Sequence, residues 1–370
     1  MFDATDRHCM QRALELARLG QYSTPPNPAV GCVIVRDGVV VGEGYHRRTG
    51  EAHAEVRALE AAGELARGAT VYVTLEPCAH HGRTPPCTDA LLNAGVARVV
   101  AAMRDPNPHV SGGGLDRLAA GGIRVAAGLL GEEAAELNRG FVSRSTRGRP
   151  WLTLKTGASL DGRTALANGQ SRWITGAAAR VDVQRLRARA SAILTGIGTV
   201  LADDPRLTVR EPALELLGRV PARVVLDTHL RMPADARVLK GGGETRVFCV
   251  HAETPARERL EAAGALVEVV PASGGHVDAR AVLERVAALG CNEVLAECGP
   301  GLAGGLLQAG LVDELVVYLA PSVLGDAARP MFRLAELQHL GARARFEFVD
   351  VARLGADLRL TARPLSRQED

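Results

Sequence analysis

Lysine is almost missing from this chain of 370 residues, because Lys155 and Lys240 are its only two and the other 42 of its 44 basic residues are arginine. An excess of one charge is missing too, since 42 acidic residues leave a net charge of only +2. Such a balance gives no long-range field that would attract nucleic acid or an acidic membrane surface. Alanine and glycine are abundant as well, so most of the arginines are interpreted as compositional bias rather than as phosphate ligands.

Long apolar runs are also missing. Six charged side chains interrupt residues 1–20, which argues against a signal peptide there, and no apolar run reaches the 18 residues of a membrane-spanning helix. Seven cysteines, an odd number spread thinly over the chain, do not have the pattern of a disulfide framework. The sequence therefore predicts a soluble, cytoplasmic protein in a reducing compartment, with cysteines that are free to bind a metal.

The length and the hydrophobic content of 46% predict a folded chain of two to three domains, at roughly 150 residues per domain. Helical and strand-like periodicities alternate along it, which is typical of an α/β layer architecture. A polar, arginine-rich stretch from Asn138 to Pro150 separates two such halves. We place a boundary there and expect one domain at residues 1–146 and a second at residues 147–370.

Expected elements follow from this periodicity. In the first half, Asp37-Gly38 joins two strands at 30–35 and 39–44, which is a strong hairpin signal. The other elements of this half are an opening helix through Met10, Leu14, Ala17 and Leu19, helices at 53–62 and 87–95, and strands at 69–75, 97–103 and 123–127. The second half is expected to have strands near 151–157, 191–195, 223–227, 246–250, 266–270, 293–297 and 314–319, helices near 177–189, 255–263, 278–289 and 301–309, and an antiparallel edge pair at 346–350 and 358–362.

Three metal-binding side chains follow one another in the first half. His53 opens a helical pattern, Cys78 follows a β-type run, and Cys87 comes nine positions later. One imidazole and two thiolates leave the fourth position of a zinc ion to water, as in catalytic zinc sites. Zinc brings the pKa of this water towards neutrality, and Glu55 is placed to pass its proton to a ring nitrogen and a departing amine.

The order of these residues matters more than any one of them. Alone, each would be an ordinary helix-start residue or a buried thiol. His53-Ala54-Glu55 on a helix, followed by Pro77-Cys78 after a strand, matches the His-x-Glu and Pro-Cys signature of zinc nucleobase deaminases. The second cysteine departs from that signature, because Cys87 lies nine positions after Cys78 where the signature has three.

This wider spacing points to a particular family. The stretch Pro77–Cys87, Pro-Cys-Ala-His-His-Gly-Arg-Thr-Pro-Pro-Cys, resembles the deaminase half of the bifunctional riboflavin-biosynthesis enzymes. Further stretches that match this family are Pro26–Gly31, Gly44–His46 and Asp105–Pro108. The resemblance implies a cytidine-deaminase-like fold for residues 1–146, with Asn27 and His46 in contact with the substrate and the segment His80–Thr84 walling its pyrimidine and phosphate side. Asn27 alone, between two prolines, would equally be a turn former.

The second half has a different glycine-rich motif, Gly299-Pro300-Gly301-Leu302-Ala303-Gly304, which follows an apolar run and opens a helix. Its backbone N–H groups could hold a pyrophosphate, but no acidic residue ends the next strand, so the Rossmann context fails. The stretches that resemble the reductase half of the same family are Leu154–Arg163, Ser171–Ile174, Arg185–Ala188 and Gly196–Pro205. The resemblance implies a dihydrofolate-reductase-like, NADPH-dependent reductase domain at residues 147–370.

The same resemblance implies a set of ligand contacts. NADPH would contact Gly157, Trp173, Thr199, Asp203 and the glycines Gly299, Gly301, Gly304 and Gly305. The substrate would contact Ser171, Arg187, Leu207, Arg210 and Glu297. Fixed arginines such as Arg187 and Arg210 suit a 5′-phosphate, although either could be one of many solvated arginines. Cys298 stands where this family commonly has glycine.

Lys155 is a candidate catalytic residue because it is one of only two lysines in the chain. It lies in a β-type segment beside the expected cofactor site, where an ammonium group could orient or protonate the sugar oxygen during hydride transfer. We therefore expect Glu55 and Lys155 to be the catalytic residues of the two halves.

The resemblance implies two consecutive steps on one ribosylaminopyrimidine phosphate. Zinc hydroxide attacks C2 of the diaminopyrimidinone and ammonia leaves, and NADPH then delivers a hydride to C1′ of the opened ribosyl group. The required cofactors would be Zn²⁺ and NADPH. The resemblance also implies a homo-oligomer joined through the reductase halves, with neither nucleic acid nor membrane as a partner.

Other functions share some of these features. A tRNA adenosine or cytidine deaminase would have the same His-x-Glu and Pro-Cys elements, but it would need a short Pro-Cys-x-x-Cys, a basic surface and more than 3% aromatic residues. It would also leave the second half unexplained. A non-catalytic paralogue that binds ligand or scaffolds other enzymes predicts a damaged zinc site, whereas all four residues are intact. A third possibility is that only one half is active.

Overall fold

The computed structural model describes residues 2–81, 85–108 and 110–365. The chain divides into a first unit of Met1–Arg149 with Glu215–Arg219 and a second unit of Pro150–Leu214 with Val220–Asp370. The arginine-rich stretch in which we placed the boundary includes helix α6 (Arg139–Arg147), which belongs to the first unit. Within the described residues, no helix is long and apolar enough to cross a membrane.

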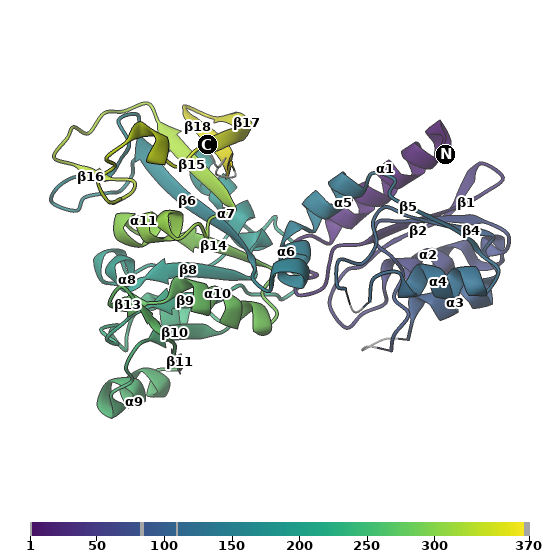
Figure 1. Ribbon diagram of the computed structural model, residues 1–370, viewed down its shortest axis with the longest axis horizontal. Coiled ribbons are helices and arrows are strands. Elements are labelled where there is room, and N and C mark those ends of the chain that lie inside the picture. The colour runs from purple at the N-terminus through teal and green to yellow at the C-terminus, as the bar shows by residue number, and fades with distance from the viewer. Residues whose placement is uncertain (1, 82–84, 109, 366–370) are drawn as a thin grey trace. The chain divides into compact units, whose positions relative to one another are not determined.

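The first unit is built on a five-stranded sheet in the order β2-β1-β3-β4-β5 (Figure 1). Its strands are β1 (Gly31–Arg36), β2 (Val39–Tyr45), β3 (Thr70–Val73), β4 (Arg98–Ala101) and β5 (Arg124–Ala127). Strands β1 and β2 are antiparallel and turn at Asp37 and Gly38, which have φ values of 52° and 79°. The predicted hairpin is thus confirmed, with the left-handed backbone that an Asp-Gly turn favours.

Helices cover both faces of this sheet, as Figure 1 shows. One face carries α1 (Ala4–Leu19) and α5 (Gly131–Leu137), and the other carries α2 (Ala54–Ala62), α3 (Cys87–Ala94) and α4 (Gly113–Ala120). Met10 and Leu14 are buried on the α1 side, and Ala58, Leu91 and Leu118 are buried on the opposite side. His53, the N-cap of α2, and Cys87, the first residue of α3, lie at one place in the unit, and the two helices agree with those expected at 53–62 and 87–95.

A buried ion pair fixes α1 to the sheet. Asp6 is 3% exposed and accepts two hydrogen bonds from the Arg98 guanidinium, at 2.7 and 2.9 Å, and one from the Tyr72 hydroxyl at 2.7 Å. The hydrogen bonds from Arg98 outweigh the effect of burial and hold the pKa of Asp6 at about 2. This carboxylate therefore links the first helix to strands β3 and β4.

Replacement of this carboxylate tests its contribution. Asp6→Asn leaves the half-buried Arg98 without its counter-charge, so we expect the free energy of unfolding at pH 7 to fall by about 2–3 kcal/mol in urea titrations. The folded-state pKa of Asp6 is depressed, so its contribution is present above about pH 4 and is lost as the pH falls towards 2. Tyr72→Phe, which removes one hydroxyl only, should cost about 1 kcal/mol. If Asp6→Asn lowered the free energy of unfolding by the same amount at pH 7 and at pH 2, the electrostatic explanation would be contradicted.

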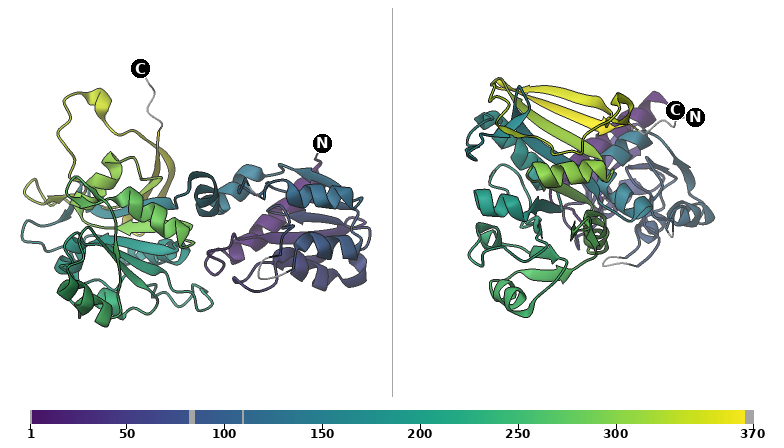
Figure 2. Two further views of the ribbon diagram at one scale, coloured as in Figure 1. Left: turned by 60° about the horizontal axis from the view of Figure 1, so that its bottom comes forward. Right: turned by 60° about the vertical axis from the view of Figure 1, so that its left-hand side comes forward.

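The second unit is built on a nine-stranded sheet in the order β11-β10-β9-β8-β14-β6-β15-β18-β17. Its strands are β6 (Trp151–Ser159), β8 (Ala192–Gly196), β9 (Ala222–Leu226), β10 (Thr245–Cys249), β11 (Leu266–Val269), β14 (Glu293–Glu297), β15 (Glu314–Ala320), β17 (Phe346–Leu354) and β18 (Asp357–Pro364). The strands from β11 to β15 are parallel, and β18 and β17 add antiparallel pairs. The predicted edge pair is confirmed, and Figure 2 shows these yellow strands at one end of the sheet.

Helices again cover both faces of this sheet. On one face lie α10 (Ala279–Ala288) and α11 (Pro300–Gln308), and on the other lie α7 (Ala177–Arg189), α8 (Ile197–Asp203) and α9 (Thr254–Ala262). Shorter elements of this unit are β7 (Arg163–Ala165) paired with β16 (Arg329–Pro330), and β12 (Ala272–Ser273) paired with β13 (His276–Val277). Helices α8 and α11 begin where the parallel strands β8 and β14 end, which is the edge at which open α/β sheets bind ligands.

Candidate active sites

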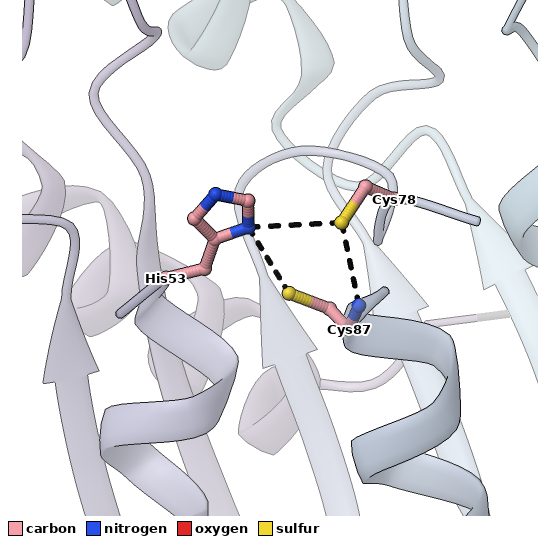
Figure 3. Close-up of side chains that lie close together, drawn as sticks. All are labelled: His53, Cys78 and Cys87. Atoms are coloured by element: carbon pink, nitrogen blue, oxygen red, sulfur yellow. Dashed lines mark hydrogen bonds between the residues drawn. The ribbon is translucent and has the colours of Figure 1, made fainter. Parts of the chain in front are cut away.

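Three side chains of the first unit converge on one point (Figure 3). His53 Nδ1 lies 3.2 Å from Cys87 Sγ and 3.6 Å from Cys78 Sγ, and all three atoms lie within 4.8 Å of one another. A tetrahedral zinc ion, bound at about 2.3 Å to sulfur and 2.0 Å to nitrogen, would separate these two atom types by about 3.5 Å. The three side chains therefore fit a zinc ion and leave one coordination position for water.

Local structure explains this convergence. His53 has extended backbone as the N-cap of α2, Cys78 follows strand β3 through Pro77, and Cys87 is the first residue of α3. The Cys87 N–H lies at a helix N-terminus and donates to Cys78 Sγ at 3.3 Å. A hydrogen bond from the Cys87 thiol is the largest of the effects that lower the pKa of Cys78, to about 4. Thiolate is the form of cysteine that binds zinc.

Glu55 lies in the first turn of α2, two residues after His53, and is 4% exposed. Burial deprives its carboxylate of water and raises the pKa of Glu55 to about 7. A carboxyl group that titrates near neutrality can accept a proton in one step and return it in another.

The residues expected to contact the pyrimidine differ in accessibility. Asn27 is partly exposed, and its Nδ2 lies 3.1 Å from Nε2 of His46. His46 is only 2% exposed, its Nδ1 lies 3.3 Å from the Ala52 carbonyl, and its ring meets that of His53 edge to face at 5.2 Å. Burial lowers the pKa of His46, which favours the neutral ring. His80 is exposed, and residues 82–84 of the expected wall lie outside the described residues.

A cavity of about 830 Å³ lies in the second unit, within the size range of small-molecule sites. It brings together most of the side chains expected at the cofactor and the substrate. Those that line it are Lys155, Gly157, Ser171, Trp173, Arg187, Thr199, Asp203, Leu207, Arg210, Glu297, Gly299 and Gly301. Cys298 lines it too. The resemblance thus selected residues from β6, α7, α8 and the start of α11 that the fold gathers around one space.

Two of the expected cofactor glycines do not line this cavity. Gly304 and Gly305 lie further along α11. A Cβ atom added to Gly304 would lie 1.9 Å from the carbonyl oxygen of Arg333. Close packing of two backbones therefore explains glycine at position 304.

An ion-pair cluster occupies the cavity wall. Lys155 and Glu297 are register partners on the adjacent strands β6 and β14, and Lys155 Nζ lies 3.9 Å from the carboxylate. Arg187, from α7, donates to both oxygens of Glu297 at 2.6 and 3.0 Å. Burial alone would raise the pKa of Glu297, but Arg187 and Lys155 outweigh it and hold this pKa at about 2. Burial also lowers the pKa of Lys155, against the opposing effect of Glu297.

Arg206 and Arg237 are among the cavity residues that the sequence prediction did not include. Burial and the positive charges of Arg187, Arg206 and Arg237 lower the pKa of Arg210. Three guanidinium groups that act in this way on a fourth favour an anionic ligand. Sequence alone offered no signal for Arg206 or Arg237, because arginine supplies 42 of the 44 basic residues.

Two protein families match the two units. Residues 3–103 match the family described as cytidine and deoxycytidylate deaminase zinc-binding region, and residues 150–360 match the RibD C-terminal domain. The riboflavin biosynthesis protein RibD of Escherichia coli (strain K12) is 51% identical over 362 residues, which are 95% of this chain and 98% of that protein. The RibD protein of Haemophilus influenzae is 43% identical over 98% of both chains.

Solved structures match over the same length. RibD of Acinetobacter baumannii (form 1) superposes with a TM-score of 0.92 at 44% identity, over 98% of this chain and 99% of that one. The diaminohydroxyphosphoribosylaminopyrimidine deaminase/5-amino-6-(5-phosphoribosylamino)uracil reductase of Thermotoga maritima has a TM-score of 0.84 at 34% identity, with the same coverage. These matches do not favour a tRNA deaminase or a non-catalytic paralogue. The expected cytidine-deaminase-like and reductase domains are confirmed, and the chain belongs to the RibD family of bifunctional deaminases and reductases of riboflavin biosynthesis.

Proposed function

We propose that the first unit deaminates 2,5-diamino-6-ribosylamino-4(3H)-pyrimidinone 5′-phosphate by hydrolysis, and that the second unit uses NADPH to reduce the ribosyl group of the product to a ribityl group. The observation that carries the first step is the convergence of His53, Cys78 and Cys87 beside the buried Glu55. The name of the Thermotoga maritima relative describes a deaminase and a reductase of this substrate type.

In the deaminase unit, His53, Cys78 and Cys87 would hold zinc, which when bound supplies a water with a pKa near neutrality. Glu55 would take one proton from this water and pass it to the ring nitrogen, and would then carry the second proton, from the new hydroxyl group, to the departing amine. Asn27 contacts the pyrimidine, with its amide held by the buried ring of His46. His80 contacts the substrate from the loop after Cys78.

In the reductase unit, NADPH would, when bound, supply the hydride for C1′ of the opened ribosyl group. Lys155 orients or protonates the sugar oxygen, and Glu297 holds Lys155 in place across the two strands. The substrate residues are Ser171, Arg187, Leu207, Arg210 and Glu297, with Arg206 and Arg237 adding positive charge for the 5′-phosphate. The cofactor residues are Gly157, Trp173, Thr199, Asp203, Gly299 and Gly301.

The second unit is also proposed to form a homo-oligomer through the edge strand β17. Phe348, Val349 and Val351 of this strand are 65%, 47% and 58% exposed. Exposed apolar side chains on an edge strand are typical of a surface that a partner covers. Light scattering of the purified protein tests this proposal, and a monomer at micromolar concentration would contradict it.

Zinc removal separates the two activities. After dialysis against a chelator, we expect ammonia release from the diaminopyrimidine phosphate to fall to background and to return when Zn²⁺ is added. NADPH oxidation with the deaminated compound should stay at its native rate, because the residues of that cavity include no zinc ligand. NADH in place of NADPH tests the choice of cofactor. Deamination that survives complete removal of zinc, or no NADPH oxidation with deaminated substrate, would contradict the corresponding half of the proposal.

A further inference from the structure

We propose that Glu76 is a positioning residue of the deaminase, whose buried carboxylate fixes Cys78 by binding the backbone N–H groups of Asp105, Gly112, Gly114 and Leu115. This inference rests on the proposed zinc deaminase. Glu76 lies two residues before Cys78, and the motifs that identified the zinc site assign it no role. Asp105, one of these donors, begins the stretch Asp105–Pro108, which resembles a family motif and has no role in the proposed reactions.

The carboxylate of Glu76 is surrounded by backbone donors. Its Oε1 accepts hydrogen bonds from the N–H groups of Gly114 and Leu115 at 2.9 and 3.1 Å. Its Oε2 accepts from the N–H groups of Asp105 and Gly112, each at 3.0 Å. Glu76 is 5% exposed, so these four hydrogen bonds replace the water that the carboxylate loses on burial.

Two of these donors belong to the first turn of α4, where N–H groups have no partner within the helix. The carboxylate of Glu76 therefore holds the N-terminus of α4, where a negative charge is also favourable. The same turn lies directly on the residue before Cys78, because a Cβ atom added to Gly114 would lie 1.9 Å from the Pro77 carbonyl oxygen. The Glu76 carboxylate therefore supports both the N-terminus of α4 and the segment that leads to Cys78.

The rest of α4 holds the other side of the zinc site. Arg117, one turn along this helix, donates to the carbonyl oxygen of Ala79 at 3.3 Å and pairs with Asp89 of α3. Ala79 follows Cys78, and Asp89 comes two residues after Cys87 in the same helix. Through Glu76 and Arg117, the position of α4 therefore sets the separation of the two sulfur ligands.

Glu76→Gln tests this arrangement with little change in size. Glutamine keeps one acceptor oxygen but turns an NH₂ group towards two N–H donors, so it can keep only half of the hydrogen bonds. Outer residues that hold metal ligands typically change metal affinity or activity by about 10- to 100-fold. We expect the zinc dissociation constant to rise by about tenfold or more, and the deaminase kcat to fall by a similar factor with little change in KM.

A cobalt-substituted protein gives a readout that does not depend on turnover. In Glu76→Gln, the thiolate-to-cobalt charge-transfer and d–d bands should shift and weaken relative to the native protein, because the geometry of the two sulfurs changes. Glu64→Gln, at an exposed position of the same unit, is the matched control and should leave both spectrum and affinity unchanged. The reductase rate of each variant, measured on deaminated substrate, should stay within twofold of native and serves as an internal check of protein quality.

Arg117→Met provides a second test, because the Arg117 side chain is 46% exposed and its loss should not prevent folding. It should shift the cobalt bands in the same direction as Glu76→Gln, by less. If Glu76→Gln fails to fold, the cobalt spectrum of Arg117→Met tests the proposal on its own. Cobalt bands and zinc affinity equal to those of Glu64→Gln in every folded variant would overturn the proposal. A native protein that binds zinc without deaminating the pyrimidine would contradict the proposed function, whereas the metal readouts would still test the role of Glu76.

Discussion

Glu55→Gln is expected to lower the deaminase kcat by about 10³- to 10⁴-fold while the zinc content stays at its native level. Glutamine has the shape of glutamate but cannot accept the proton of the zinc-bound water or return it to the leaving amine. The metal should stay bound, because its three protein ligands are His53, Cys78 and Cys87 and the variant replaces none of them. Ammonia release, measured beside zinc content by atomic absorption, checks both halves of this expectation.

The same variant should lose no stability. Glu55 is buried and its pKa is raised to about 7, so folding works against its charged form at higher pH, and a neutral amide avoids this cost. Reductase activity should be native. A deaminase rate within tenfold of native would mean that another group transfers the proton, and loss of zinc from the variant would mean that Glu55 supports the metal rather than the chemistry.

Lys155→Met is expected to lower the reductase kcat by about 10²- to 10³-fold, with deamination unchanged. Methionine keeps much of the length of the side chain but removes the ammonium group beside the sugar oxygen. Lys240→Met is a natural control, because Lys240 is the other lysine of the chain and is exposed. NADPH oxidation with deaminated substrate measures the effect. A rate within a factor of two of native, in a folded Lys155→Met protein, would exclude a catalytic role for Lys155.

The pH dependence of the reductase gives an independent test of the same residue. Burial lowers the pKa of Lys155, and the neighbouring Glu297 opposes this by stabilising the ammonium form. If the ammonium form is active, the rate falls as the pH rises through this lowered pKa. Glu297→Gln removes the opposing charge, so the pKa of Lys155 falls further and the alkaline limb of the rate profile moves to lower pH. A limb that moved to higher pH, or disappeared, would contradict this assignment.

Periodicity predicted the elements with strong side-chain patterns and missed those without them. The Asp37-Gly38 turn signal correctly predicted the β1–β2 hairpin. The helix expected at 177–189 has the same bounds as α7. Helix α4 was missed because it begins in Gly112-Gly113-Gly114, which has high backbone entropy and resembles a loop. Helix α8 was missed for a related reason, since its short sequence contains Gly198 and follows a strand without a polar cap.

The zinc ligands could be found in the sequence because metal chemistry restricts each of them to a few residue types in a fixed order. Glu76 could not be found in this way, because its partners are backbone N–H groups that any residue supplies. Arg206 and Arg237 could not be singled out, because arginine is the common basic residue throughout the chain. Gly304 was expected at the cofactor, and its close backbone packing against Arg333 is a contact that the sequence did not reveal. Sequence reasoning thus identifies side-chain chemistry more readily than backbone contacts.

The pairing of β6 with β14 has a consequence for how this protein can change. Lys155 and Glu297 meet because each is at a matched position of its parallel strand. Side chains alternate between the two faces of a sheet, so inserting or deleting one residue within either strand before these positions would turn one of the two charges to the opposite face. A variant with such a length change would bury an unpaired charge under α10 and α11 and would leave the other charge without its partner. We therefore expect variation in the length of this chain to fall in its loops, with both strands kept at constant length.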